Sequence, residues 1–238
     1  MLRCTVLFAA AFALIGSAGC GRIVTGSGTS ATETREIGDV TEVVLSGGGN
    51  LIVVPGDANR LIVTADDNVL PLLETKTDGN KLTLTTKSGY AISEKTPITF
   101  TLFVKKLEKL SVSGSGNASG EGLAGESLEL KVSGSGDIAM KGIDHDTIDV
   151  KVSGSGNVTL GGNANKLTAK VSGSGSVEGR DLHVAGAEAT ITGSGDMKVW
   201  ATDDLKVRVS GSGDVQYKGR PKIEKKVSGS GSVKPLEE

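Results

Sequence analysis

The feature that most constrains this fold is a short motif, Val-Ser-Gly-Ser-Gly followed by Asn, Asp or Ser, that recurs seven times. The copies begin at Val112, Val132, Val152, Val171, Ile191, Val209 and Val227. Their spacings are 20, 20, 19, 20, 18 and 18 residues, and residues 46–50 (Ser-Gly-Gly-Gly-Asn) are a candidate degenerate earlier copy. A flexible linker has no reason to hold such a register, so the period predicts a repeat architecture.

Each copy lies in a segment where apolar and polar residues alternate. Between Leu128 and Met140, for example, the even positions carry Leu, Leu, Val, Gly, Gly, Ile and Met, and the odd positions are mostly polar. This period of two is typical of a strand with one buried face. About 20 residues at roughly 3.3 Å each give a perimeter that suits one rung of a solenoid. We therefore expect an all-β, parallel β-solenoid over residues 110–234, with equivalent residues in vertical register.

Each rung is predicted to contain a five-residue strand, the Ser-Gly-Ser-Gly segment, a strand of three or four residues and a Gly-containing turn. The glycines occupy inward-facing positions of the alternating pattern, where they would allow a sharp corner or close approach of the opposite wall. The serines fall on the outward parity, where their hydroxyls could hydrogen-bond along a column. The final Asn or Asp could bond to the backbone of its own turn. This last position is occupied in turn by Asn117, Asp137, Asn157, Ser176, Asp196, Asp214 and Ser232.

Residues 36–109 lack the motif but remain strand-like. Segments that resemble strands lie at 41–45, 50–54, 61–64, 81–85 and 97–104. Residues 69–74 fit one short helical turn. We expect this region to form the first, less regular rungs or a cap, because an uncovered solenoid end is an open sheet edge.

Residues 1–19 have the organisation of a secretory signal peptide: a basic start, an apolar run too short to span a bilayer, and small residues before Cys20. Ser-Ala-Gly-Cys at 17–20 resembles a bacterial lipobox, with Ser at the usual leucine position. That resemblance implies cleavage before Cys20 and acylation of its thiol; the alternative is an ordinary signal that leaves a free thiol. Residues 20–35 are rich in Gly, Ser and Thr, and we expect a flexible tether.

The strand region ending at Leu110, followed by serial Ser-Gly-Ser-Gly-Asx copies behind a lipoprotein-like leader, resembles the GIN domain family of bacterial exported proteins. That family is also called the putative auto-transporter adhesin head domain. The resemblance covers about residues 36–234 and implies a right-handed parallel β-helix-like fold. It implies an adhesion-related function and supplies no catalytic residues. We expect a protein of the cell envelope, lipid-anchored at the outer membrane and facing the periplasm or the surface.

Three functions remain open from the residues. The first is a non-enzymatic binding or scaffold module whose partners are the membrane, through its anchor, and an extracellular glycan or protein. The second is a carbohydrate-active enzyme on a parallel β-helix, for which the densest titratable clusters are residues 144–146 (Asp-His-Asp) and 203–204 (Asp-Asp), both expected in turns. Such chemistry would need His145, Asp146 and a Lys or Arg in one cleft. The third is calcium binding along the Gly-Asx column.

The first reading is favoured, with no catalytic residue, no cofactor and no metal expected. A feature present in most rungs is normally architectural, which weakens the repeat aspartates as catalytic or calcium-binding groups. Formal net charge is −2 with no basic stripe, so nucleic-acid binding has little support. Aromatic content of 3% argues against a sugar-stacking groove. His183 is expected on an outward strand position, and Trp200 and Tyr217 in rim or interior packing.

Overall fold

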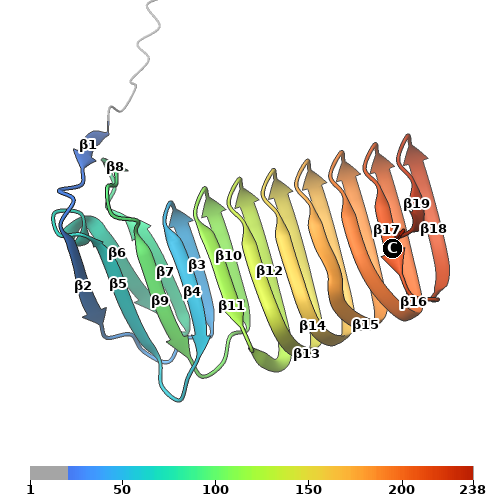
Figure 1. The fold of residues 1–238 in the computed structure, drawn as a ribbon, viewed down its shortest axis with the longest axis horizontal. Coiled ribbons are helices and arrows are strands. Elements are labelled where there is room, and N and C mark those ends of the chain that lie inside the picture. Colours follow the sequence, from blue (N-terminus) through green and yellow to red (C-terminus); the bar gives the residue numbers. More distant parts are fainter. Residues whose placement is uncertain (1–20, 238) are drawn as a thin grey trace, which may run out of the picture.

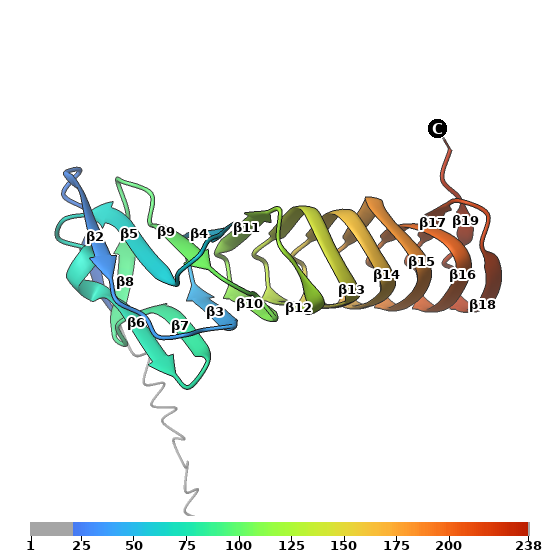
Figure 2. The ribbon, with the colours of Figure 1, turned by 90° about the horizontal axis from the view of Figure 1, so that it is seen from below.

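The computed structural model describes residues 21–237, which form β strands and one short 3-10 helix. The strands stack into an elongated row of rungs that starts at an irregular cap and ends at an open last rung (Figure 1). Seen from below, the cap is wider than the coil that follows it (Figure 2). The predicted all-β solenoid with an irregular N-terminal region is confirmed. The predicted signal peptide and Cys20 lie outside the described residues.

The regular coil is made of strands that each end at a motif glycine. It begins with β10 (Lys109–Gly114) and β11 (Asn117–Glu121), and continues through β12 (Ala124–Gly134), β13 (Ile138–Gly154), β14 (Val158–Gly173), β15 (Val177–Gly193) and β16 (Met197–Gly211). From β13 to β16, each strand leaves one motif corner and curves around the far end of the rung to the next corner, with register shifts such as that between Met140 and Ile143. In these four strands a bend takes the place of a separate turn. The predicted glycine is nevertheless present there, since Gly142 and Gly162 have positive φ, and Gly122 and Gly219 interrupt the strand in two other rungs.

Successive rungs are in register and parallel. Val132 pairs with Val152 and Gly134 with Gly154, and the same alignment of motif positions holds from β10 to the last rung. The predicted vertical register is confirmed. Inward residues of each rung stack into columns that fill the interior. One such column consists of Val112, Val132, Val152, Val171, Ile191 and Val209, all buried.

The two motif glycines have different roles. The first, such as Gly154, has a positive φ of 127°, a conformation that side chains with a Cβ rarely adopt. A Cβ on the second, such as Gly156, would overlap the carbonyl oxygen of Gly136 and lie 2.7 Å from Cγ1 of Val132. Both neighbours belong to the preceding rung, so the close approach is between adjacent rungs rather than opposite walls.

The candidate earlier motif copy at 46–50 is the first corner of the coil. Gly47 aligns with Gly114 and Asn50 with Asn117, which confirms it as a copy. Its strands pair in parallel with β10 and β11 on one side and with β7 and β9 on the other. The bounds are β3 (Glu42–Gly47), β4 (Asn50–Pro55), β7 (Lys81–Thr86) and β9 (Thr99–Val104).

Beyond β7 and β9 the pairing becomes antiparallel, which ends the coil. One antiparallel strand pairs with β7, while β5 pairs with both β9 and β2. These elements are β2 (Ser30–Arg35), β5 (Arg60–Asp66) and β6 (Leu73–Asp78), with the 3-10 helix η1 (Leu70–Leu72) between the last two. The helix lies where one helical turn was predicted. Residues 36–109 thus contain both the first rung and a cap.

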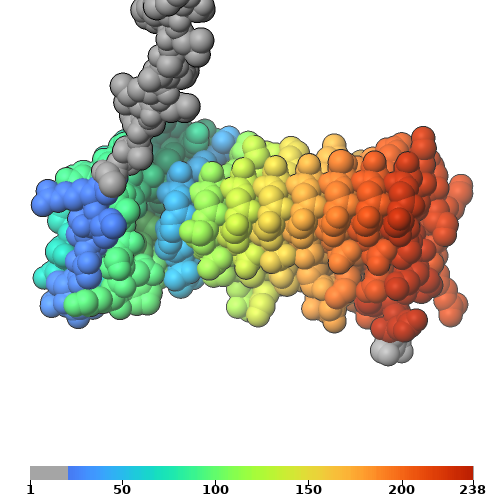
Figure 3. Space-filling model, turned by 90° about the horizontal axis from the view of Figure 1, so that it is seen from above, coloured from blue at the N-terminus to red at the C-terminus, as the bar shows by residue number. Residues whose placement is uncertain are grey.

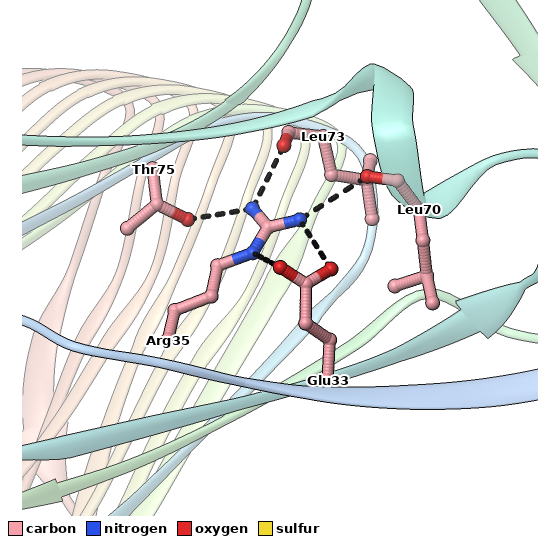
Figure 4. A network of polar contacts seen from close by, with 5 residues as sticks. All are labelled: Glu33, Arg35, Leu70, Leu73 and Thr75. Carbon is pink, nitrogen blue, oxygen red and sulfur yellow. Dashed lines mark hydrogen bonds and ion pairs between the residues drawn. The ribbon is translucent and has the colours of Figure 1, made fainter.

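The prediction of a flexible tether is wrong for most of residues 20–35. β1 (Arg22–Thr25) pairs with β8 (Tyr90–Ser93), and β2 pairs with β5. The Arg35 guanidinium donates to the carbonyl oxygens of Leu70 (3.1 Å) and Leu73 (2.7 Å) and to Thr75 Oγ1 (2.8 Å), as Figure 4 shows. A Gly- and Ser-rich composition indicated flexibility, but backbone pairing and this guanidinium tie the segment to the cap.

A buried carboxylate closes the cap around residues 26–28. Asp66 is 0% exposed. Its Oδ1 accepts from Gly28 N (2.8 Å) and Thr96 Oγ1 (2.9 Å), and its Oδ2 accepts from Lys95 N (2.9 Å) and Thr96 N (3.0 Å). Burial alone would raise the pKa of Asp66, but these donors together lower it to about 2. The carboxylate therefore holds the cap loops together in its charged form.

Among residues 21–237, no strand or helix covers the C-terminal end as the cap covers the other. The last complete rung consists of β17 (Val215–Lys218) and β18 (Lys222–Gly229), and β19 (Val233–Pro235) pairs with β17 as the start of a further rung. Every residue of β18 is exposed, including Ile223 and Val227. Lys225 stands at the inward position that Val207 occupies in β16. A charged residue at an inward edge position discourages the addition of another strand.

Candidate functional site

The motif corners form a straight ridge along one edge of the coil. In each corner after the first, the N–H of the second serine donates to the carbonyl oxygen of the first motif glycine in the preceding rung; Ser155 N to Gly134 O is 2.9 Å. Gly156 N donates to the same oxygen at 3.1 Å. Figure 3 looks down on this ridge, whose corners succeed one another from the first corner to the last rung. The motif is thus a backbone joint between rungs.

The Asn and Asp side chains that follow the glycines bridge rungs as well. Asp137 Oδ1 accepts from Asn157 N (2.8 Å), and Asn157 Oδ1 accepts from Ser176 N (3.2 Å) and Ser176 Oγ (2.7 Å). The expectation that these side chains bond their own turns is wrong, because their oxygens reach the next rung. Nor do serines of successive motifs hydrogen-bond to one another within residues 21–237, so the predicted hydroxyl column is also wrong.

These bonds explain how an aspartate carboxylate on the ridge is satisfied by N–H and O–H donors of the next rung. The hydroxyl and N–H of Ser232 lower the pKa of Asp214. A carboxylate that accepts from the next rung stays charged while serving as a structural acceptor. Within the described residues, no group of three or more His, Cys, Asp or Glu side chains is placed to hold a metal ion. The calcium reading therefore gains no support from the geometry of the ridge.

The Asp-His-Asp cluster at 144–146 lies at the far end of a rung, within strand β13 rather than in a turn. Its histidine points inward: His145 is 3% exposed, and neither ring nitrogen has a hydrogen-bond partner. Burial lowers the pKa of His145, although the neighbouring Asp144 and Asp146 oppose this effect. Burial therefore disfavours the charged form of this imidazole.

A shallow pocket of about 220 Å³ opens beside this cluster. It is lined by Asp144, His145, Asp146, Asn163, Ala164, Asn165, His183, Ala185 and Thr202. This lining contains no Lys or Arg, so the combination that would favour the enzyme reading is not assembled there. Asp203 and Asp204 are exposed on strand β16, also outside any turn. Asp204 lines a different groove of about 460 Å³ between β14 and β18.

The remaining singled-out residues pack near the rim of the coil. His183 is half-buried, with its ring 4.8 Å from that of Trp200 in an edge-on arrangement. Lys218 Nζ lies 4.1 Å from the centre of the Trp200 ring. Tyr217 is partly buried against the core. Trp200 and Tyr217 therefore have the packing roles predicted, whereas His183 is less exposed than expected.

A hollow that sequence reasoning missed lies at the N-terminal end of the ridge. Its volume is about 520 Å³. It is lined by Gly47, Gly48, Gly49, Asn50, Thr86, Tyr90, Ile92, Glu94, Ile98, Ser115 and Asn117. Two signals in the sequence pointed to it: the first corner has Gly48 where every later copy has a serine, and residues 87–98 separate β7 from β9 where a regular rung needs three residues.

Three solved structures resemble this fold. A crystal structure described as a putative adhesin from Bacteroides fragilis is 23% identical, with a TM-score of 0.86 over 90% of this chain and 100% of that chain. One described as a putative lipid binding protein from Parabacteroides distasonis is 26% identical, with a TM-score of 0.77 over 91% and 100%. A putative adhesin from the same species is 25% identical, with a TM-score of 0.71 over 90% and 100%.

No curated protein matches the chain. A family model described as "Putative auto-transporter adhesin, head GIN domain" matches residues 39–221, which is most of the chain. The match begins before the first corner and ends at residue 221, so it covers the coil as far as β17 and leaves out β18 and the last corner. The resemblance stated from the motif is confirmed, and the protein belongs to the auto-transporter adhesin head, GIN domain family.

Proposed function

We propose that this protein is an exported, lipid-anchored binding module without catalytic activity. The observation that carries the proposal is the use of the whole repeated motif as a joint between rungs, which leaves a rigid rod with long exposed faces. Solenoids of this kind present extended surfaces to large ligands. The adhesin names of the family and of its solved relatives point in the same direction. The partner we favour is an extracellular glycan.

The anchor part of the proposal rests on Cys20 and the leader before it. Several acyl chains, at about 0.8 kcal/mol per buried methylene, would hold the rod on a membrane stably. The test is to express the full chain in a bacterium with the lipoprotein pathway and compare it with Cys20→Ser. We expect the native protein to carry an acyl mass and to sediment with membranes, and the variant to do neither. A variant that retains the acyl mass would contradict the anchor.

The binding part is tested with a glycan array probed by residues 21–238. Reproducible binding at moderate salt supports the module, and a blank array with an intact circular dichroism spectrum contradicts glycan binding. The same protein incubated with the polysaccharides that it binds should release no reducing ends. Release of new ends would overturn the non-enzymatic assignment in favour of a carbohydrate-active enzyme.

A further inference from the structure

The first corner of the ridge differs from all later corners in its backbone hydrogen bonds. In every later corner, the serine N–H donates to a glycine carbonyl of the preceding rung, as Ser115 N does to Gly47 O at 3.1 Å. The corresponding N–H groups of Gly48 and Gly49 make no hydrogen bond within residues 21–237. The preceding layer has no corner there, because the chain leaves the coil after Thr86 and returns at Ile98.

That departure creates the hollow of about 520 Å³ described above. Residues 87–98 pass around it instead of under it, and β8 supplies Tyr90 and Ile92 to its wall. Where later rungs would place a glycine carbonyl beneath the N–H groups, this end of the ridge has an open space. Unpaired backbone donors that face a concave space are ready to bind a ligand that can accept hydrogen bonds.

The rest of the lining indicates what kind of ligand fits. Glu94 contributes a carboxylate whose Oε2 accepts from Ile98 N at 2.9 Å, so the side chain is held at the wall. This negative charge disfavours an anion, although adjacent N–H groups alone would attract one. Asn50 and Ser115 add groups that both donate and accept. The ligand must therefore accept from amides and donate to a carboxylate without carrying net negative charge.

Apolar groups occupy the remaining wall. Tyr90, Ile92 and Ile98 line the hollow, and Tyr90 is one of few aromatic residues in the chain. Small-ligand sites combine such apolar walls with a few polar groups in pockets of about 300–1,000 Å³. A saccharide matches this combination, because each hydroxyl both donates and accepts while the ring carbons pack on apolar surface.

We infer that the hollow at the first corner is a binding site for a neutral saccharide unit, with Gly48 N–H and Gly49 N–H donating to its hydroxyls and Glu94 accepting from them. This rests on the proposed binding function and narrows it to one end of the rod. The site is built where the repeat is interrupted, so the later corners, whose serine amides are all paired, form no equivalent.

The test uses residues 21–238 labelled with nitrogen-15, titrated with the methyl glycosides of glucose, galactose, mannose and N-acetylglucosamine. We expect at least one glycoside to shift the Gly48 and Gly49 amide signals with saturation, while the Gly136 and Gly156 amides stay in place. No shift at Gly48 and Gly49 with any of the four would overturn the site. Shifts produced by sodium phosphate instead would also overturn it, in favour of an anion site.

A matched pair of variants tests the location. Ser115→Trp adds a large side chain at the wall of the hollow, and Ser135→Trp adds the same side chain one rung later, at an equally exposed motif position. We expect Ser115→Trp to weaken glycoside binding by about tenfold or more, which is about 1.4 kcal/mol, and Ser135→Trp to leave it unchanged. Equal effects of the two variants would overturn the assignment.

Glu94→Gln tests the acceptor, since the amide oxygen of Gln can still accept from Ile98 N. We expect weaker glycoside binding with an unchanged fold, and binding equal to the native protein's would contradict the role of the carboxylate. Binding on the glycan array without any shift of the Gly48 and Gly49 amide signals would overturn this site but would still support the binding function. No saccharide binding in either assay would contradict both.

Discussion

The two ends of the rod close the same coil in opposite ways. At the N-terminal end, antiparallel strands and a 3-10 helix cover the first rung, held by the buried Asp66 and the partly buried Arg35. At the C-terminal end, β18 is fully exposed and Lys225 occupies an inward position. The N-terminal edge is covered by the cap. The C-terminal edge is exposed, and its inward lysine disfavours pairing with a further strand. The difference shows that an edge can be protected by packing or by charge.

The interior of the coil between these ends should be the least tolerant of change. Gly156→Ala places a methyl group on the carbonyl oxygen of Gly136 and against Val132, and both belong to a neighbouring rung that cannot move alone. We expect a loss of about 3 kcal/mol, seen as a melting temperature lower by roughly 6–12 °C. Thermal melting by circular dichroism measures it.

The control is Gly48→Ala at the first corner. A Cβ there meets nothing nearer than the Ser115 hydroxyl oxygen at 3.9 Å. We expect a change within about 0.5 kcal/mol. If both substitutions had the same effect, close stacking of adjacent rungs would not explain the second motif glycine.

The cap should fail before the coil does. Asp66→Asn replaces an acceptor of four hydrogen bonds with a group that presents N–H to other donors, so we expect the melting temperature to fall by about 5 °C. Hydrogen exchange should accelerate in β1, β2 and β8 and stay unchanged in β13 and β14, since rungs interact with their nearest neighbours. Uniform acceleration along the rod would show that cap and coil unfold as one unit.

The same carboxylate fixes an acid limit for the cap. Its pKa is about 2 when folded, below the ordinary value of 3.8, so the unfolded chain takes up the proton first as the pH falls. The stability contributed by Asp66 is therefore complete above pH 4 and is lost as the pH falls from 3.8 toward 2. In Asp66→Asn, the protection factors of the cap amides, which are corrected for the intrinsic pH dependence of exchange, should no longer change across this interval; persistence of the change would assign it to another group.

A further prediction concerns the far end of the rungs, where neither ring nitrogen of the buried His145 has a hydrogen-bond partner. Burial lowers the pKa of His145 below its ordinary value of 6.5. As the pH drops below 6.5, the unfolded state therefore binds a proton more readily than the folded state does, and the free energy of unfolding decreases. His145→Val, which copies the inward Val184 of a later rung, should stabilise the coil by about 1 kcal/mol at pH 7.5, and by more at pH 5.

Melting at the two pH values measures this effect, with His183→Val as the control because His183 is half-buried and meets the Trp200 ring edge-on. A native protein whose melting temperature is the same at both values, or a His145→Val variant with the native pH dependence, would contradict the interpretation.

The smallest effect on stability is expected at the open end. Lys225→Val restores an apolar residue to the inward column and makes β18 a regular edge. We expect little change in melting but a shift from monomer to dimer in sedimentation at about 100 µM. Lys226→Val removes the same charge from the adjacent outward position and should stay monomeric. Equal association of both variants would show that net charge, not inward placement, protects this edge.

The sequence predicted the coil better than its ends. Strict alternation and a near-constant period depend on neighbours 18 to 20 residues away, so the vertical register followed directly. The antiparallel cap did not follow, because its strands pair across different distances in the chain. Residues 30–35 were assigned to a tether on composition, yet their stability comes from the Arg35 contacts and from pairing with β5.

The candidate sites were harder still. The hollow at the first corner depends on what is missing beneath Gly48, and a missing rung leaves no motif to find. The inward direction of His145 could be inferred from alternation, but its cluster was expected in a turn because a turn was expected at the far end of each rung. The structure instead places residues 144–146 within the bent strand β13.

The corner hydrogen bonds run both ways: Ser155 N–H donates to the Gly134 carbonyl of the rung before it, and Ile138 N–H donates to the Asn157 carbonyl of the rung after it. Because every regular corner offers the same donors and acceptors to both neighbours, a rung can be removed or duplicated as a block of about 20 residues without altering either terminus. Each block changes the length of the rod by about 4.8 Å. The number of motif copies thus determines the distance between the first rung and the last.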